Sequence, residues 1–287
     1  MDDRELLNVV MDIVGRENCL DDCAVLPCGD RVMVATTDML HRTTDFVPGM
    51  SDWQIGWMSA AVTISDIASM GAAPVYILIA VGLDDWHHLA GVMQGAQDCC
   101  KKFGAAIIGG DIDRHGELTV VTTGLGLVES KFLVRRMGAK PGDLVCITGT
   151  PGQAQAYLDG YKAFEKQLFE PQPRVEEGQL LGRSGASAMM DDSDGIALSL
   201  YDLSGVNNCG FSIDSAKIPK PSGIAEAPAR ELALYGGGDY ELIFTLPLSE
   251  HPVKGLTYSV IGTVTAEKSV LVDGKPLEKR GYQHRWE

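Results

Sequence analysis

The sequence predicts an α/β protein, with α+β as the related possibility, folded as two lobes of similar size. Its 287 residues are 45% hydrophobic, which is enough to bury a full core. Strand-like and helix-like apolar stretches alternate along both halves. A polar bend containing Gly and Pro, residues 135–143, separates them. We therefore expect one domain over residues 1–134 and a second over residues 135–287.

The first half is expected to contain strands and two long helices. Residues 31–37 predict a strand, and residues 53–70 predict a helix that stops at Gly71 and Pro74. A buried strand over 75–82, a helix over 86–103 and a strand over 105–108 follow. Residues 118–128 are rich in Thr and Val, which fit a pleated surface, and predict a long strand.

The second half starts again with a strand over residues 144–148. Helices are expected over 153–161, 175–183, 195–206 and 226–234, and strands over 240–246 and 258–264. The sequence has no low-complexity tract and no short repeat. Both lobes are therefore expected to mix strands with helices.

Charge and hydropathy exclude several classes of protein. The formal net charge of −15 argues against a nucleic-acid or anionic-membrane surface, because both need a basic face. The longest apolar run, residues 72–83, is too short to span a bilayer, and the acidic N-terminus lacks the apolar segment of a signal peptide. The seven cysteines are scattered and odd in number, which favours reduced thiols, and Cys19, Cys23 and Cys28 contain no CxxC pair. We expect a cytoplasmic protein.

Short acidic clusters recur along the chain, and nearly all are expected where an apolar run ends. Carboxylates interleaved with hydroxyls suit Mg²⁺, which takes a few carboxylates and is completed by water and substrate phosphates. Helix capping and turn formation explain any single cluster equally well. Asp66 favours the metal, because it falls on an otherwise apolar stripe of the predicted helix, where an unpaired carboxylate is costly. The clusters are Asp21-Asp22, Thr36-Thr37-Asp38, Ser65-Asp66, Gly109-Gly110-Asp111 and Asp191-Asp192-Ser193-Asp194.

Three further motifs each have a functional and a plain interpretation. The run Gly236-Gly237-Gly238 precedes Asp239-Tyr240-Glu241 and indicates either close approach of the backbone to a ligand or a flexible turn. The turn Gly149-Thr150-Pro151-Gly152 offers backbone N–H groups to an anion or is only a tight turn. Arg136 and Lys140 either contact phosphate or are solvated charges. Neither a Walker motif nor a GxGxxG turn is present.

In their order, these motifs resemble those of the thiamine-monophosphate kinase family, within the aminoimidazole-ribonucleotide-synthetase-like fold superfamily. The resemblance runs nearly from end to end and includes Gly138–Asp143, Gly195, Leu242 and the C-terminal Gly281-Tyr282-Gln283-His284. It implies transfer of the ATP γ-phosphoryl group to thiamine monophosphate, giving thiamine diphosphate. It also implies a homodimer in which the first lobe's sheet pairs with its copy and ATP lies across the subunit junction.

The resemblance also assigns roles to individual residues. The catalytic residues it implies are Asp38, Asp66, Asp111 and Arg136, and the ATP contacts are Gly110, Asp111, Arg136 and Ser193. The Mg²⁺ ligands it implies are Asp22, Thr36, Thr37, Asp38, Asp66, Asp111, Asp191 and Asp194. The thiamine-phosphate contacts it implies are Asp45, Gly238 and Tyr282. Many relatives carry His at the position of Asp45 and Glu at that of Gly238, so this chain departs from the family in its substrate contacts.

The implied chemistry needs no general base. A phosphate monoester has its second pKa near ~6, so the attacking oxygen is already largely ionised at neutral pH. Another ATP-using synthetase of the superfamily would need a group that handles a phosphorylated intermediate or delivers ammonia, and we find no such residue. A non-catalytic cation-binding protein would explain the carboxylates but neither Arg136 nor the glycine run.

Overall fold

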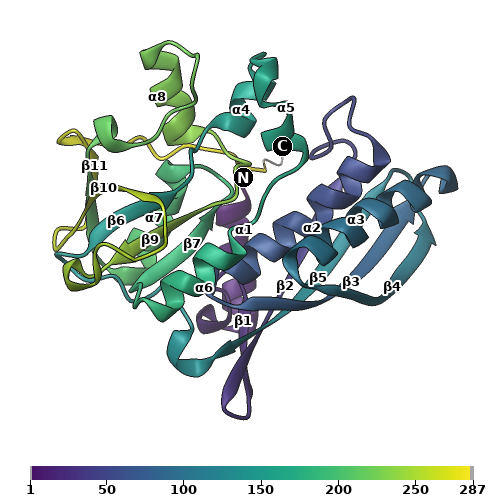
Figure 1. Ribbon diagram of the computed structural model, residues 1–287, viewed down its shortest axis with the longest axis horizontal. Coiled ribbons are helices and arrows are strands. Elements are labelled where there is room, and N and C mark those ends of the chain that lie inside the picture. Colours follow the sequence, from purple (N-terminus) through teal and green to yellow (C-terminus); the bar gives the residue numbers. More distant parts are fainter. Residues whose placement is uncertain (1, 285–287) are drawn as a thin grey trace.

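The computed structural model describes residues 2–284 and contains two β-sheets with helices packed on them (Figure 1). The first sheet has the strand order β1-β2-β5-β3-β4, and the second has the order β12-β11-β8-β10-β6-β9-β7. The strands of the first sheet are β1 (Ala24–Cys28), β2 (Arg31–His41), β3 (Ala73–Leu83), β4 (Ala106–Arg114) and β5 (Thr119–Glu129). Those of the second are β6 (Leu144–Thr148), β7 (Ala188–Asp192), β8 (Gly210–Ile213), β9 (Glu241–Leu246), β10 (Tyr258–Thr265), β11 (Val270–Val272) and β12 (Lys275–Pro276).

Helix α2 (Asp52–Ser69) is the central element of the molecule. It begins with a capping box in which Ser51 accepts from the Gln54 N–H, and it is buried almost all round. One side packs with α3 (Leu89–Phe103) over the first sheet, while the other contacts β7 and α6 (Val175–Arg183) of the second half (Figure 1). Contact on every side explains why its sequence is apolar without a clear polar face. Any polar side chain on α2 therefore faces either a neighbouring element or a site.

The other face of the first sheet exposes apolar side chains, and no element within residues 2–284 covers them. Side chains alternate between the two faces of a strand. Asp38 and Ile79 face the helices, so the residues next to them in β2 and β3 point away from the helices. Met39, Tyr76 and Leu78 lie on this face and are 59%, 46% and 39% exposed. An apolar sheet face of this kind indicates an interaction surface.

The second sheet is packed against α7 (Ile196–Asn207) and α8 (Glu226–Tyr235), whereas the shorter helices α4 (Gln153–Leu158) and α5 (Glu165–Phe169) pack with the core of the first half. Its edge strand β7 pairs with β9 in the register Asp191 to Leu242. Because β7 also contacts α2, the acidic end of β7 meets the first lobe. The junction of the two halves thus gathers polar side chains from both.

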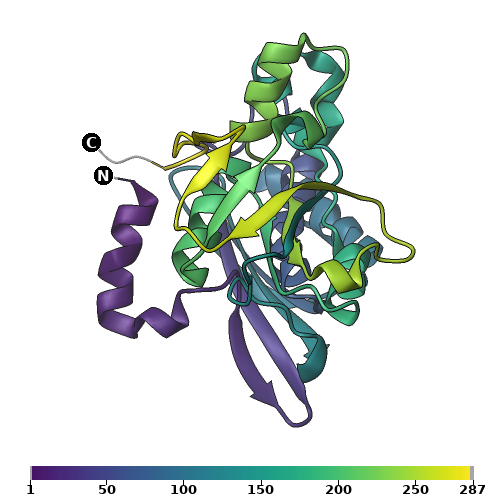
Figure 2. The same cartoon turned by 90° about the vertical axis from the view of Figure 1, so that its left-hand side faces the viewer.

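Helix α1 (Asp3–Val14) stands apart from the body of the molecule (Figure 2). Arg4 ties it to the second half through Asp194 and Asp202, at N–O distances of 2.9 Å and 2.8 Å. The backbone N–H of Asp3 also donates to the carbonyl of His284, so the two ends of the described chain lie together. The helix is amphipathic, and its apolar residues are largely exposed.

The mixed α/β fold class is confirmed, and most expected elements form within one or two residues of their predicted ends. Two predicted strand ends were wrong, and these errors change the positions of two candidate site residues. The strands over 31–37 and 105–108 continue to His41 and Arg114, so Asp38 and Asp111 lie within strands rather than after them. Strands β1, β7, β8, β11 and β12 and helices α1 and α5 were not expected. The boundary between residues 134 and 135 stays a prediction.

Within residues 2–284, none of the helices combines the length and the apolar character needed to cross a membrane.

Candidate active site

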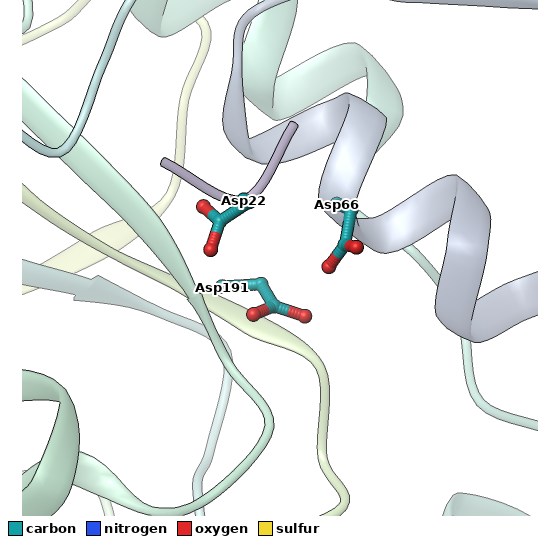
Figure 3. Close-up of side chains that lie close together, drawn as sticks. All are labelled: Asp22, Asp66 and Asp191. Carbon is teal, nitrogen blue, oxygen red and sulfur yellow. The ribbon is translucent and has the colours of Figure 1, made fainter. Parts of the chain in front are cut away.

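Three carboxylates from distant parts of the chain converge at the junction of the two halves. Asp22 comes from the segment before β1, Asp66 from α2 and Asp191 from β7, and their side chains point toward one another (Figure 3). One carboxylate oxygen from each lies within 4.8 Å of those of the other two. We call Asp22, Asp66 and Asp191 the carboxylate triad.

The triad concentrates negative charge in a place with little water. Burial, followed by the charge of Asp38 and of the other two triad members, raises the pKa of Asp66 well above its usual value. Burial and then Asp22 raise the pKa of Asp191 to about 8. The pKa of Asp38 is also raised, mainly by burial. Carboxylates held together in this way need protons or a cation to offset their repulsion.

Each of these carboxylates accepts a hydrogen bond from a hydroxyl group. The donors are Thr36 to Asp66 at 2.6 Å, Thr63 to Asp38 at 2.6 Å, Ser65 to Asp191 at 2.9 Å and Ser69 to Asp22 at 2.6 Å. These bonds fix the orientation of the carboxylates and leave other lone pairs directed at one another. An oxygen-only donor set of this kind fits Mg²⁺.

Arg136 lies beside the triad and is bound to one of its members. Its Nε donates to Oδ1 of Asp22 at 2.8 Å, and its Nη2 contacts the same oxygen. The neighbouring Arg135 pairs with Asp21 instead, at 2.5 Å. The backbone N–H of Lys140 donates to Asp143 within its own turn, and of the predicted basic pair it is Arg136 whose side chain contacts the triad.

The chain after β7 forms the next part of the site. Asp194 is paired with Arg4, and its carbonyl accepts from the Tyr282 N–H at 3.0 Å. The carbonyl of Ser193 accepts from the Gly238 N–H at 2.7 Å, which joins the glycine run to the end of β7. These backbone bonds bring the C-terminal segment and the glycine run to the triad.

A cavity of about 360 Å³ opens from the triad. Asp38, Asp66, Asp191, Ser193 and Asp194 line one part of it, and Asp45, Gly238 and Tyr282 line another. The volume falls within the range of small-molecule sites. Four of the residues that the resemblance assigns to metal, Asp38, Asp66, Asp191 and Asp194, therefore share one cavity with those that it assigns to thiamine phosphate.

Asp45 has a structural role besides lining the cavity. Its Oδ2 accepts from the His41 N–H at 2.8 Å and from the Thr44 hydroxyl at 2.6 Å, and so caps the turn after β2. Tyr282 is 43% exposed, and burial followed by Asp45 raises its pKa to about 12. Both interpretations of Asp45, as a cap and as a substrate contact, are compatible with this geometry.

Thr37, Gly110 and Asp111 are not brought to the triad within one chain. Thr37 points to the uncovered face of the first sheet, where its hydroxyl donates to the Thr122 carbonyl. Gly110 pairs with Ile79, Ile79 with Thr122 and Thr122 with Asp38, so three strand spacings, about 14 Å, separate Gly110 from Asp38. Asp111 is the next residue on this edge strand and is exposed.

The Gly152 N–H at the end of the turn 149–152 is bonded to a carboxylate of the protein itself. Asp239 accepts from the backbone N–H groups of Gly152 and Ala154, at 2.5 Å and 2.9 Å. Burial raises the pKa of Asp239 to about 7, although these hydrogen bonds oppose the shift. The geometry therefore favours a tight turn over an anion-binding site at these residues.

Several cavity residues had no signal in the sequence. Its lining is completed by Met39, Leu40, Thr44, Val47, Met58, Val62, Gln155, Leu158, Leu168, Gly237, Tyr240 and His284. Tyr240 follows the glycine run directly, and that run was the one available hint. Burial, followed by Asp191 and Asp38, raises the pKa of the Tyr240 phenol well above its usual value.

Comparison with known proteins agrees with this site. Residues 20–128 match the family model described as AIR synthase related protein, N-terminal domain. A thiamine-monophosphate kinase of Methanospirillum hungatei is 51% identical over 100% of both chains. One of Halobacterium salinarum is 39% identical over 99% of this chain and 100% of its own.

The chain belongs to the thiamine-monophosphate kinase family. A solved structure described as AaThiL complexed with AMPPCP and TMP superposes with a TM-score of 0.92 at 25% identity, over 99% of this chain and 97% of that one. The resemblance drawn from the sequence motifs and the enzyme class, a phosphotransferase, are thus confirmed. Membership of this kinase family also accounts for the two features that lie together here, a carboxylate triad that suits a cation and Arg136, which contacts Asp22 of that triad.

Proposed function

We propose that this protein transfers the γ-phosphoryl group of ATP directly to thiamine monophosphate, giving thiamine diphosphate. The observation that carries the proposal is the carboxylate triad opening into a cavity of about 360 Å³, in a member of the thiamine-monophosphate kinase family. The complex of a structural relative with AMPPCP and TMP supports ATP and thiamine monophosphate as the two substrates.

Mg²⁺ is the metal that fits the donor set. Asp22, Asp66 and Asp191 would hold it, with Asp38 and Asp194 beside them at the same cavity. Thr36, Thr37 and Asp111 are the remaining proposed ligands: Thr36 contacts Asp66, whereas Thr37 and Asp111 lie away from the triad of their own chain. Bound Mg²⁺ supplies the positive charge that offsets repulsion between the phosphates of the two substrates.

The residues of the chain then act by positioning. The acceptor phosphate is largely ionised at neutral pH, because its second pKa lies near ~6, so no side chain has to remove a proton. Arg136 offers a planar, permanently charged donor that suits a phosphate of ATP. The attacking oxygen and the leaving β-phosphate of ATP have to lie roughly in line across the γ-phosphorus. A single direct transfer inverts the configuration at phosphorus.

A homodimer would complete the ATP site. Gly110 and Asp111 lie on an edge strand about 14 Å from Asp38 in their own chain. Met39, Tyr76 and Leu78 leave an apolar sheet face uncovered, and pairing it with a second copy would bury it. We propose that this pairing brings the partner's Asp111 toward ATP.

Mass-spectrometric detection of thiamine diphosphate tests the proposed function. The wild-type protein, ATP, Mg²⁺ and thiamine monophosphate are expected to give that product, and aminoimidazole precursors are expected to give none. Product formed from the aminoimidazole precursors alone would favour a synthetase of the superfamily. A chiral γ-thiophosphate donor is expected to give inversion, whereas retention would indicate a phosphoenzyme.

Sedimentation of a sheet-face variant tests the dimer. Leu78→Glu places a charge on the uncovered face and is expected to give a monomer with weakened ATP turnover. Leu248→Glu is the matched control, because Leu248 is 66% exposed in a turn of the second half. A wild-type protein that sediments as a monomer yet turns over would contradict the proposed role of the second copy.

A further inference from the structure

Tyr240 has an unusual backbone conformation for a large aromatic residue. Its φ of 54° lies in the left-handed region, which L-residues with bulky side chains rarely adopt. Such a conformation is costly and persists only where the surrounding structure fixes it. The position of Tyr240 in the cavity wall makes this conformation relevant to function.

The two neighbours of Tyr240 hold its backbone from the opposite side. Asp239 accepts from the N–H groups of Gly152 and Ala154. Glu241 is 4% exposed, accepts from the Thr148 hydroxyl at 2.6 Å and is paired with Arg174. With both carboxylates bonded into the second half, the side chain between them is directed into the cavity.

The position of the Tyr240 hydroxyl is set by the end of β7. Strand β9 pairs Leu242 with Asp191 and Glu241 with Asp192, so Tyr240 lies just beyond the last pair, beside Ser193. Of the charged groups around it, Asp191 and Asp38 act on the phenol more strongly than Asp194 and Asp45. Tyr240 therefore shares the cavity wall with Asp38, Asp191 and Ser193.

The ring and the hydroxyl of Tyr240 have different environments. The half-buried ring packs against the core of the first half. Within residues 2–284 we find no hydrogen-bond partner for the hydroxyl. The pKa of the phenol is raised by burial and then by neighbouring carboxylates. A phenol that donates to nothing in the protein, next to a cluster of anions, is suited to an anionic ligand.

We propose that the Tyr240 hydroxyl donates a hydrogen bond to the phosphate of the acceptor substrate and so selects a phosphate ester over the corresponding alcohol. This inference rests on the proposed function, because it concerns the same cavity. The inference also explains the glycine run: Gly237 lets the backbone pass Ser193 and Asp194 closely, and Gly238, with a φ of 90°, donates its N–H to the Ser193 carbonyl just before Tyr240 enters the cavity wall.

Kinetics of Tyr240→Phe test the proposal, because this change removes the hydroxyl and keeps the packed ring. We expect kcat/KM for thiamine monophosphate to fall about 10- to 100-fold, the loss typical of a hydrogen bond to a charged group. The KM for ATP is expected to stay unchanged. The inhibition constant of unphosphorylated thiamine is also expected to stay the same, because thiamine lacks the phosphate that the hydroxyl contacts.

Tyr201→Phe is the matched control. Its hydroxyl donates to the Leu277 carbonyl at 2.5 Å, away from the cavity, so its loss should lower the melting temperature without changing either KM. An unchanged kcat/KM for thiamine monophosphate in Tyr240→Phe, or an equal loss of affinity for thiamine, would overturn the inference. A wild-type protein that makes no thiamine diphosphate would instead contradict the proposed function, and the inference with it.

Discussion

Arg136 and Asp22 form a buried ion pair at the edge of the carboxylate triad. The side chain of Asp22 is 1% exposed, and Nε of Arg136 lies 2.8 Å from its Oδ1. A buried carboxylate needs a partner, because removing one member of such a pair leaves an uncompensated charge. The same arginine is the proposed ATP contact. Arg136 therefore links the charge balance of the metal-free site to nucleotide binding.

Arg136→Gln is expected to destabilise the metal-free protein by about 3–5 kcal/mol, the usual effect of breaking a buried ion pair. Mg²⁺ should restore more stability to the variant than it adds to the wild type, because the metal takes over the neutralising role. Chemical denaturation with and without Mg²⁺ measures both effects. Arg230→Gln is the control, since Arg230 and its partner Asp273 are 44% and 40% exposed, and the loss of this pair should change stability much less. Equal losses in the two variants would contradict the special role of Arg136.

Asp38→Asn and Asp66→Asn are each expected to abolish turnover while the protein stays folded. Each change removes a charge from the proposed Mg²⁺ site with little change in shape. Without Mg²⁺, Asp66→Asn is expected to melt at a higher temperature than the wild type, because a raised pKa marks Asp66 as a carboxylate whose charge the fold disfavours.

Thermal melting at increasing Mg²⁺ concentrations, alongside product formation, measures both effects. Asp30→Asn removes a charge from the exposed turn between β1 and β2 and serves as the control. Near-normal activity of either site variant at low Mg²⁺ would argue against the metal assignment.

Asp192→Asn is expected to stabilise the metal-free protein increasingly as the pH rises. Asp192 is fully buried, its Oδ2 has no hydrogen-bond partner among the described residues, and burial raises its pKa well above the usual value. Between the unfolded and folded pKa values the unfolded chain binds fewer protons, so wild-type stability falls as pH rises. Asn keeps the shape and does not titrate.

Denaturation of the wild type and Asp192→Asn at a series of pH values from 4 upward, in chelator, tests this sign. The difference in unfolding free energy should be smallest at the acid end. A difference that shrinks as the pH rises would contradict the prediction. Asp273→Asn is a useful contrast, because hydrogen bonds from Ser215 lower the pKa of Asp273. Loss of the Asp273 carboxylate should therefore destabilise the protein most at pH values above the usual carboxylate pKa.

The sequence predicted local features better than the way in which they meet. Helix α2 was expected within one residue of each end, because its capping residue, apolar run and terminal glycine are all local signals. The convergence of Asp22, Asp66 and Asp191 depends on the contact between α2 and β7, which no local pattern specifies. β7 itself was not expected. Its short apolar run, Ala188-Met189-Met190, runs directly into the acidic residues.

Strand length explains the remaining differences at the site. Asp38 and Asp111 were expected to follow strands and instead lie within β2 and β4, where alternation decides which face a side chain takes. Asp38 consequently faces α2, where Thr63 donates to it. Asp111 lies on a distant edge strand. Only the family resemblance related these two residues, and a single chain does not bring them together.

Asp45 and Tyr282 are expected to determine affinity for the thiamine end of the acceptor. Asp45→Ala and Tyr282→Ala should raise the KM for thiamine monophosphate much more than the KM for ATP. An acidic group suits the cationic thiazolium ring, and an aromatic face can contact a cation. Because Asp45 also caps the turn after β2, the alanine variant alone does not separate its two roles.

Asp45→Asn makes that separation. Its side-chain oxygen can still accept from the His41 N–H, so the turn is kept while the negative charge is lost. If the charge contacts the thiazolium ring, Asn should raise the KM for thiamine monophosphate nearly as much as Ala does, with an unchanged melting temperature. If Asp45 only caps the turn, Asn should behave like the wild type, and Ala should lower the melting temperature and affect both substrates alike.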